Sequence, residues 1–294
     1  GVFNRHVAQG VYCMTQSLMS LARVPLRVGL IGYGTIGNHV AQKLLDGNTL
    51  PHAHLSAVLV QRERELPREL VGKDVLFTTD PEKFFAQQWD VAVEAAGQPA
   101  VLSCGLRCLG LGRKFLITSV GALCDEAFHS ELVSAAEAAS TQLLLAAGAM
   151  PGMDWMSSAA LETVEEVTIT QTKRPEGWLG TPAEDVVDLK SLSAACTVFR
   201  GSAREAATLF PKNANISAAL ALATCGLDKA AVELVADPSV SGPMNQVRLV
   251  GAVGEISLLV KGKPAAGSQR TSMIVPLSVV KALRNLSSPQ FVGI

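Results

Sequence analysis

Residues 26–45, LRVGLIGYGTIGNHVAQKLL, decide the fold of the first half of the chain. The apolar, β-branched run 26–31 follows Pro25 and is typical of a buried strand. Gly32, Gly34 and Gly37 then form a G-x-G-x-x-G pattern, and apolar residues follow at helical spacing. A strand, a glycine turn and a helix in this order are the context that a dinucleotide-binding motif requires. The stretch therefore predicts a Rossmann domain.

Each glycine of the motif has a separate predicted role. Gly32 makes the tight turn, Gly34 lets the backbone approach a pyrophosphate, and Gly37 lets helix and strand pack closely. Thr35 and Ile36 begin the helix, whose free N–H groups and partial positive charge face the phosphates. We expect all five residues to bind the cofactor.

The end of the second predicted strand, HLSAVLVQRERE (54–65), bears on the choice of cofactor. An acid commonly stands there and holds the adenosine ribose 2′-hydroxyl. Here Gln61 occupies that place and is followed by Arg62 and Arg64. No carboxylate repels a 2′-phosphate, and guanidinium groups pair well with one. The prediction is NAD or NADP, with NADP favoured, although the arginines fit a solvated charge run as well.

Small residues follow the next predicted strands. The strands 91–95 and 115–119 flank a predicted helix over 101–111, and a further strand lies within 141–152. Their carboxyl ends carry Ala96-Gly97, Val120-Gly121-Ala122 and Gly148-Ala149. Such residues fit a ligand lying across the crest of the sheet, and fit close helix packing nearly as well. Ala96, Gly97 and Ala122 are predicted cofactor contacts.

The pattern changes after about residue 150. Residues 165–174, EEVTITQTKR, alternate as a half-exposed strand, and further strands are predicted over 229–237, 245–253 and 255–262. Two segments carry the residues of a capping box, and we assign them to helix starts rather than catalysis: Thr181 with Glu184, and Ser202 with Glu205.

The predicted fold class is α/β, a doubly wound parallel Rossmann sheet followed by an α+β substrate and dimerisation domain. The expected parts are an N-terminal extension (1–24), a dinucleotide-binding domain (25–150), a substrate domain (151–275) and a C-terminal helix (276–294) that packs back on the first domain. Residues 1–24 contain no acid, which is compatible with an organelle transit peptide. An upstream extension, with Met14 as the start, is the favoured alternative.

Composition excludes several classes of function. A net charge of −1 and a pI near 6.6 give no electrostatic footprint for nucleic acid or an anionic membrane. The apolar runs are interrupted well before the ~20 residues of a spanning helix. Cys104-x3-Cys108 lacks a second ligand pair, so no metal site is predicted. The scattered cysteines suggest reduced thiols in a cytoplasmic protein.

The segment 210–226, FPKNANISAALALATCG, places Lys212, Asn213 and Asn215 before a nearly featureless Ala/Leu helix. Polar residues at such a helix start can be caps. Two amides and a lysine can equally bind a nicotinamide carboxamide and a substrate carboxylate. The local chemistry leaves both interpretations open.

Together the motifs resemble the L-aspartate dehydrogenase family, over nearly the whole chain from Leu26. The most specific stretch is GSAREAATLFPKNANISAALALA (201–223). The others are GLIGYGTIG (29–37), VEAAG (93–97), SVGAL (119–123), GAMPGMD (148–154), GTPAEDVVDL (180–189) and VADPSV (235–240). The resemblance implies a homodimer that uses NAD or NADP to oxidise L-aspartate to iminosuccinate, which hydrolyses to oxaloacetate and ammonia, or that catalyses the reverse reaction. It also implies that Ala149 and Asn215 contact the cofactor.

The chain departs from the family at the catalytic histidine. After Ala-Asp-Pro the family has a short turn and then Asn-x-His, and gap-free matching from Ala236 puts Asn245 in the histidine position. Arg270 stands where the family has a lysine, and Pro151 stands where a glycine is usual. The candidate groups for the substrate are Lys212, Asn213 and Arg270; the two cations fit its carboxylates.

An amide can orient a substrate or water by hydrogen bonds but cannot take up a proton. The favoured hypothesis is an amino-acid dehydrogenase in which Lys212 or solvent accepts the proton and Asn245 orients the substrate. The alternatives are a reductase of another amino or imino dicarboxylate and a non-catalytic NADP(H)-binding protein.

Overall fold

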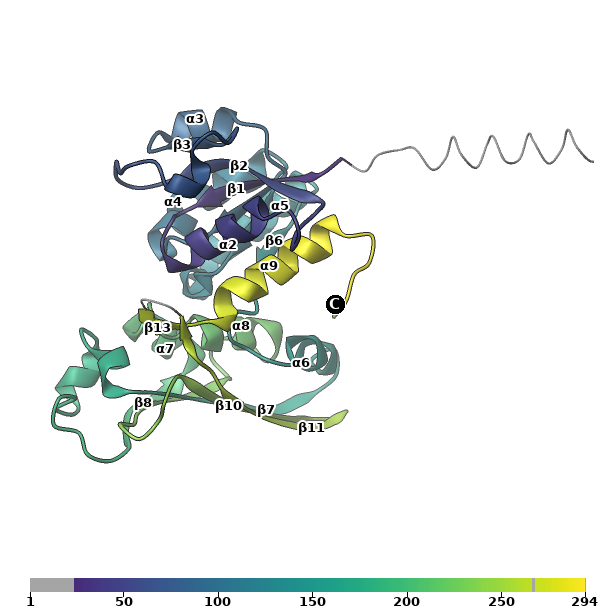
Figure 1. Cartoon of the computed structure of the whole chain (residues 1–294). Coiled ribbons are helices and arrows are strands. Elements are labelled where there is room, and N and C mark those ends of the chain that lie inside the picture. The colour runs from purple at the N-terminus through teal and green to yellow at the C-terminus, as the bar shows by residue number, and fades with distance from the viewer. Residues whose placement is uncertain (1–23, 266–267, 294) are drawn as a thin grey trace, which may run out of the picture.

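The computed structural model describes residues 24–265 and 268–293. The predicted extension therefore lies outside the described residues, apart from Val24. Figure 1 shows two layered units, one above the other, with the C-terminal helix running along the upper one. Among the described helices, none combines the length and apolar character needed to cross a membrane.

The first unit contains a six-stranded sheet in the order β3-β2-β1-β4-β5-β6, and all its neighbouring strands are parallel. Its strands are β1 (Leu26–Ile31), β2 (Ala53–Leu59), β3 (Leu76–Thr78), β4 (Val91–Glu94), β5 (Lys114–Ile117) and β6 (Leu143–Leu145). This is the strand order of a dinucleotide-binding Rossmann fold. The predicted fold class of this half is confirmed.

Helices cover both faces of this sheet. One side carries α2 (Thr35–Leu45) and α9 (Ile274–Ser287), which contact each other, and the other carries α4 (Gln98–Gly110) and α5 (Glu126–Ala138). A short helix α3 (Pro81–Ala86) begins at Asp80, whose side chain accepts from the N–H groups of Glu82 and Lys83. The C-terminal helix thus packs on the first unit, in contact with α2 and β2.

The second unit contains a mixed sheet in the order β11-β10-β7-β9-β8. Its strands are β7 (Val164–Lys173), β8 (Cys196–Ser202), β9 (Ala231–Ala236), β10 (Met244–Gly251) and β11 (Gly254–Lys261). The helices α6 (Met153–Ala159), α7 (Ala203–Leu209) and α8 (Asn215–Ala223) lie on the face toward the first unit. The pair β12 (Pro264–Ala265) and β13 (Ser268–Ser272) precedes α9.

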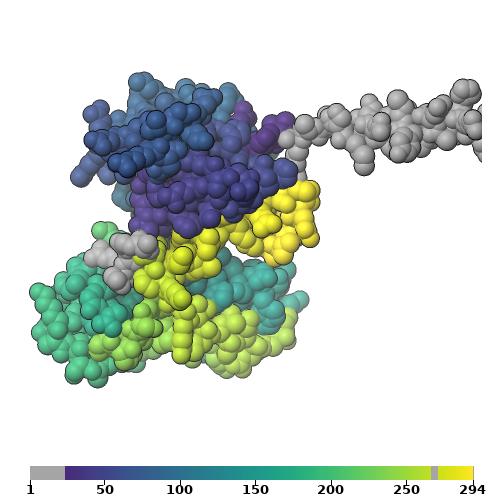
Figure 2. All heavy atoms as spheres, in the orientation of Figure 1, coloured from purple at the N-terminus to yellow at the C-terminus, as the bar shows by residue number. Residues whose placement is uncertain are grey.

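A continuous apolar core joins the two units. The buried helix α8 packs against the 3₁₀ helix η2 (Val120–Cys124) of the first unit. Residues of both units belong to one buried cluster, for example Ile117, Leu123 and Ala218. Figure 2 shows the yellow C-terminal segment between the purple first unit and the green second unit. The two units are therefore joined by packed apolar side chains.

The two predicted capping boxes have different outcomes. At Ser202 the box is present, because its side chain accepts from Glu205 N–H and the Glu205 carboxylate accepts from Ser202 N–H. At Thr181 the predicted helix start is present, because Thr181 is the N-cap of a short 3₁₀ helix, η4 (Pro182–Asp185), but the reciprocal bond with Glu184 that makes a box is not. The Thr181 hydroxyl accepts from Ala183 N–H and donates to the Trp178 carbonyl. The 3₁₀ helix ends at Asp185 and does not continue as an α-helix.

Candidate active site

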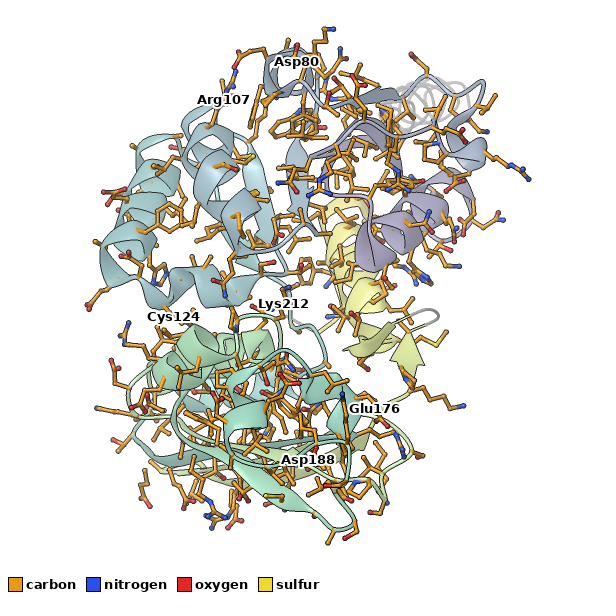
Figure 3. The ribbon with its side chains drawn as sticks, turned by 90° about the vertical axis from the view of Figure 1, so that its left-hand side faces the viewer. Asp80, Arg107, Cys124, Glu176, Asp188 and Lys212 are labelled. Atoms are coloured by element: carbon orange, nitrogen blue, oxygen red, sulfur yellow. The ribbon has the colours of Figure 1, made fainter. Side chains whose placement is uncertain are left out.

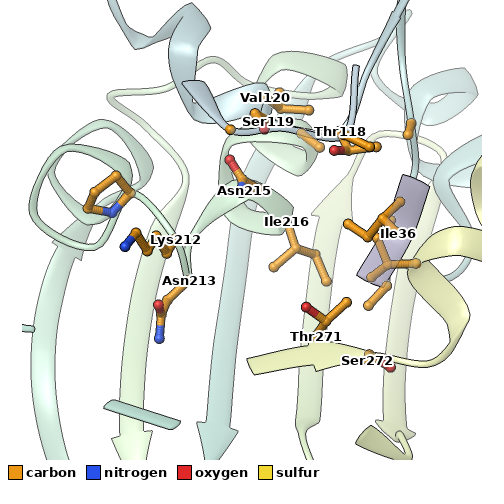
Figure 4. Close-up of a pocket in the computed structure, with 18 of the residues that line it drawn as sticks. Ile36, Thr118, Ser119, Val120, Lys212, Asn213, Asn215, Ile216, Thr271 and Ser272 are labelled. Atoms are coloured by element: carbon orange, nitrogen blue, oxygen red, sulfur yellow. The ribbon is translucent and has the colours of Figure 1, made fainter. Parts of the chain in front are cut away.

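A cavity of about 690 Å³ lies between the crest of the first sheet and the second sheet. The first unit contributes the segments that follow β4, β5 and β6. The second contributes the ends of β7 and β10, the start of α8 and the β13–α9 junction. Figure 4 shows Ile36, Thr118, Asn215 and Thr271 arranged around this space. It is the crest position at which Rossmann folds bind ligands.

The wall from the first unit is built around a buried carboxylate, Glu94, at the end of β4. Its Oε1 accepts from the N–H groups of Ala96 and Gly97, at 2.7 Å each, and from the Ser119 hydroxyl at 2.9 Å. Its Oε2 accepts from the N–H groups of Thr118 and Ser119 at 3.2 and 3.0 Å. One side chain therefore fixes the loops after β4 and β5. The cavity is left with small side chains and ordered backbone on this side.

The glycine turn has the geometry that its sequence predicts. Gly32 has a φ of +97°, and an added Cβ would lie 2.6 Å from the Ala95 carbonyl oxygen. A Cβ on Gly37 would collide with the Gly32 carbonyl oxygen. Neither position has room for a side chain, and Gly32 also has a backbone conformation that L-residues rarely adopt.

Gly34 differs from its two neighbours because a Cβ there would meet nothing within 4 Å. The space beside it is open, and it is the N-cap of α2, whose first N–H groups receive no side-chain cap. Open space at an uncapped helix start suits a pyrophosphate. The chain's own residues therefore fit a dinucleotide at this turn.

The floor of the cavity comes from the second sheet. Gln171 and Asn245 are direct cross-strand neighbours on β7 and β10, and Lys173 follows two residues later at the end of β7. All three are buried and line the cavity. Alternation explains their placement: Val167, Ile169, Gln171 and Lys173 share the buried face of β7.

The amides before α8, Asn213 and Asn215, are structural partners as well as lining residues. Asn213 donates from Nδ2 to the Gly177 carbonyl at 2.9 Å, and Asn215 accepts from Gly121 N–H through Oδ1 at 3.0 Å. Neither caps α8, whose N-cap is Ala214 with no side-chain bond. Lys212 is exposed at the rim, and Figure 3 places it where the two units meet.

The cavity brings together eight of the predicted site residues: Ile36, Ala96, Gly97, Ala149, Lys212, Asn213, Asn215 and Asn245. Seven others lie outside its lining: Gly32, Gly34, Thr35 and Gly37 in the turn, Gln61 and Arg62 after β2, and the buried Ala122. The backbone of Arg270 lies in β13, but its side chain is outside the described part of the structure.

A polar cluster adjoins the glycine turn where an adenosine ribose would lie in a Rossmann fold. Arg64 donates to the Tyr33 carbonyl at 3.2 Å and lies over the Tyr33 ring. Glu69 accepts from the Tyr33 hydroxyl and from Asn38 Nδ2, both at 2.8 Å. Hydrogen bonds to its carboxylate, beginning with its own backbone N–H, lower the pKa of Glu69. The Glu69 carboxylate therefore stabilises the glycine turn through these hydrogen bonds.

The chain matches two protein-family models and several curated proteins. The family model "Aspartate dehydrogenase, C-terminal" matches residues 154–286, and "Homoserine dehydrogenase, NAD binding domain" matches residues 32–146. An L-aspartate dehydrogenase of Ruegeria pomeroyi is 40% identical over 88% of this chain and 92% of its own length. One of Pseudomonas aeruginosa is 38% identical over 88% of this chain and 97% of its own.

The chain belongs to the L-aspartate dehydrogenase family. Among solved structures, an aspartate dehydrogenase of Thermotoga maritima aligns with a TM-score of 0.70 at 26% identity, covering 91% of this chain and 99% of its own. As a member of this family, the chain is an amino-acid dehydrogenase, and its first unit is a domain for a nicotinamide cofactor. The predicted resemblance is confirmed.

The polar lining residues that were not among the predicted site residues include Gln171, Lys173 and Ser119. The signal for the first two was present in the strand 165–174. Continuing the apolar alternation of Val167 and Ile169 places Lys173 on the core face, where a lysine is rare without a function. Ser119 gave no such signal, because its position depends on its contact with Glu94.

Proposed function

We propose that this chain oxidises L-aspartate with NAD or NADP to iminosuccinate, which hydrolyses to oxaloacetate and ammonia, or catalyses the reverse reaction. The observation that supports this most is a cavity with two lysines, Lys173 and Lys212, at the crest of a nicotinamide-dependent Rossmann domain. Among the lining residues that the structure describes there is no Asp or Glu. Such a site favours an anionic amino acid.

The proposed reaction removes a hydride from Cα and a proton from the substrate nitrogen, leaving a C=N bond. The nicotinamide ring, when bound, supplies the hydride acceptor. Gly32, Gly34, Thr35, Ile36 and Gly37 would hold the pyrophosphate.

Four cavity residues would contact the cofactor around the ring: Ala96, Gly97, Ala149 and Asn215. Ala122 is buried behind the cavity wall and would pack against it. The amide of Asn215 already bonds Gly121 N–H through its oxygen. Its Nδ2 donor would therefore face a carbonyl acceptor, such as that of the carboxamide.

Asn245 would orient the substrate or the attacking water. Its side chain is 6% exposed, lines the cavity and lies beside Gln171. Because an amide does not take up protons at accessible pH, the proton would pass to Lys212 at the rim or to solvent. We therefore expect activity to rise steeply toward alkaline pH, where the free amine predominates.

NADP would be accepted at least as well as NAD. Gln61 and Arg62 follow β2, and Arg64 is fixed against the carbonyl of Tyr33 in the glycine turn. Glu69, the acid that contacts the glycine turn, is occupied by Tyr33 and Asn38. A 2′-phosphate would pair with the guanidinium groups of Arg62 and Arg64.

We also propose that the enzyme is a homodimer acting in the cytoplasm. In support of a dimer, the edge strand β11 exposes Leu259, which is 56% exposed, beside the outer face of the second sheet. Light scattering on the purified protein measures the assembly, and a monomer at micromolar concentration would contradict it.

The test of the activity is nicotinamide reduction by a panel of amino acids, with both cofactors, across pH 6 to 10. L-aspartate should be the best substrate, and the rate should climb with pH. The variant Asn245→His should add activity near neutral pH, up to the ~10²–10⁴-fold that a general base provides. A preference for another dicarboxylate, or cofactor binding without turnover of any substrate, would overturn the aspartate assignment. An unchanged pH profile in Asn245→His would remove residue 245 from the reaction centre.

A further inference from the structure

The cavity contains a buried cation to which the sequence resemblance gives no role. Lys173 is the last residue of β7, its side chain is 7% exposed, and it lines the cavity. The other lysine of the lining, Lys212, is exposed at the rim. A buried ammonium is costly unless it is paired or hydrogen-bonded, so the contacts that place Lys173 in the cavity bear on its role.

The surrounding chain holds this lysine in a fixed position. The 3₁₀ helix η3 (Pro175–Trp178) turns back over it, and a Cβ on Gly177 would lie 3.3 Å from Lys173 Cβ and 3.4 Å from Cδ. The ammonium lies 5.1 Å from the centroid of the Trp178 ring, within range of a cation–π interaction. The close approach of Gly177 therefore confines the aliphatic stem, and the indole faces the charge.

Trp178 and Gly177, which confine Lys173, are each held by a hydrogen bond. The fully buried Trp178 donates from its indole nitrogen to the Val235 carbonyl at 3.0 Å. The Gly177 carbonyl accepts from Asn213 Nδ2 at 2.9 Å. Asn213 is therefore a positioning residue, which links the specific segment before α8 to the lysine on β7.

Gln171 and Asn245, which line the same floor as Lys173, have neutral side chains. The side-chain oxygen Oε1 of Gln171 accepts from the buried Ser217 hydroxyl at 2.7 Å, and Asn245 is the cross-strand neighbour of Gln171. The one buried acid behind the opposite wall, Glu94, has both oxygens occupied by the groups of its own loops. The described lining of the cavity therefore contains two lysines and no acid.

We propose that the Lys173 ammonium binds a carboxylate of the substrate and makes the enzyme specific for dicarboxylic amino acids. The inference rests on the proposed oxidation of L-aspartate and assigns its specificity to one residue. A charge-assisted hydrogen bond to a desolvated carboxylate is among the stronger polar contacts, whereas a rim lysine such as Lys212 is screened by water. Losing one partner of such a buried pair costs on the order of 100-fold in affinity.

The test is the variant Lys173→Met, which keeps the length of the side chain and removes the charge. The expected result is a KM for L-aspartate about 100-fold higher, with an unchanged dissociation constant for NADPH. The ratio of kcat/KM for L-aspartate to that for L-asparagine should fall toward one, because asparagine lacks the side-chain carboxylate. The matched control is Lys261→Met, at the exposed end of β11 and outside the cavity lining, which should behave as wild type.

A second variant changes the position of the Lys173 side chain and keeps its charge. Gly177→Ala keeps the lysine but places a methyl group against its stem. The KM for L-aspartate should rise about tenfold, an order-of-magnitude figure for a misplaced contact, while kcat changes less. A loss of kcat with an unchanged KM would show that η3 does not position a substrate-binding group.

The failures of the two proposals are distinguishable. If wild type oxidises L-aspartate and Lys173→Met keeps its KM and its discrimination against asparagine, the role of Lys173 is wrong and the proposed function stands. If wild type does not oxidise L-aspartate, the proposed function fails, and succinate binding to the NADPH complex tests Lys173 by calorimetry. Succinate binding that weakens in Lys173→Met would support the carboxylate site, and equal binding or none would overturn it.

Discussion

The two walls of the cavity are built on opposite principles. The Rossmann wall shows mainly small side chains, and the carboxylate behind it, Glu94, accepts hydrogen bonds from the backbone N–H groups of its own loops. The distal floor shows long polar side chains, Gln171, Lys173 and Asn245, that face the cavity. The first arrangement shapes a surface for a ligand common to many enzymes. The second supplies the groups that distinguish one substrate from another.

The largest effect is expected where the Rossmann wall depends on a single side chain. Glu94→Gln replaces an acceptor with an amide whose NH₂ group faces backbone donors. Leaving buried donors unpaired should lower the free energy of unfolding by about 3 kcal/mol. The control is Glu82→Gln, which breaks an exposed ion pair with Arg107 and should leave stability nearly unchanged. Equal urea midpoints for the two variants would contradict the role of Glu94.

The second prediction separates cofactor binding from folding. Gly34→Ala places a methyl group in open space, so stability should be kept, while a pyrophosphate could no longer approach the backbone. We expect the affinity for NADPH to fall at least tenfold, on the order expected when a close ligand contact is blocked. Gly110→Ala, also in open space but at the far end of α4, is the control and should change neither property.

The third prediction concerns the turn beside the Rossmann wall. Arg64→Gln removes a guanidinium that is fixed on the Tyr33 carbonyl. Loss of one charge-assisted contact should weaken NADPH binding about tenfold. NADH binding, which involves no 2′-phosphate, should change little. An equal loss for both cofactors, measured by fluorescence titration, would assign Arg64 to the structure of the turn alone.

The smallest effect is expected at the opposite edge of the first sheet. Burial raises the pKa of Asp90, but hydrogen bonds from Arg27 more than offset this, so the pKa is lowered on balance. The resulting stabilisation is present above the unfolded pKa of about 3.9 and is lost as pH falls through the lower folded value. Asp90→Asn should therefore cost about 0.5 kcal/mol at pH 7, since the pair is partly exposed.

Urea unfolding at pH 7 and pH 3 measures this difference, which should shrink at the lower pH. The affinity for NADPH should stay at the wild-type value, because the amino ends of the strands lie away from the crest. A loss of NADPH binding in Asp90→Asn would show that the two edges of the sheet are not independent.

The contrast between the walls also explains what the sequence could predict. The Rossmann wall is encoded locally, since a strand, three glycines and a helix start lie within 20 residues (26–45). The predicted strands 91–95 and 115–119 likewise follow from short apolar runs, with the small residues 96–97 and 120–122 after them. Local patterns therefore sufficed for the fold class.

The distal floor depends on contacts between distant segments. Gln171 meets Asn245 only through the β7–β10 register, and Lys173 is confined by Gly177, which Asn213 holds from the other side. No short pattern encodes such pairings. At Thr181 the local pattern predicted the helix start correctly, but it could not tell that the helix would be a single 3₁₀ turn without a capping box.

The central claim is that a nicotinamide dinucleotide binds at the glycine turn and faces the distal floor. Calorimetric titration of the purified protein with NADPH and with NADH tests it directly. The expected result is saturable binding of one molecule per chain, with NADPH bound at least as tightly as NADH. Absence of heat and of any stabilisation with both nucleotides would contradict the account, whatever the floor residues do.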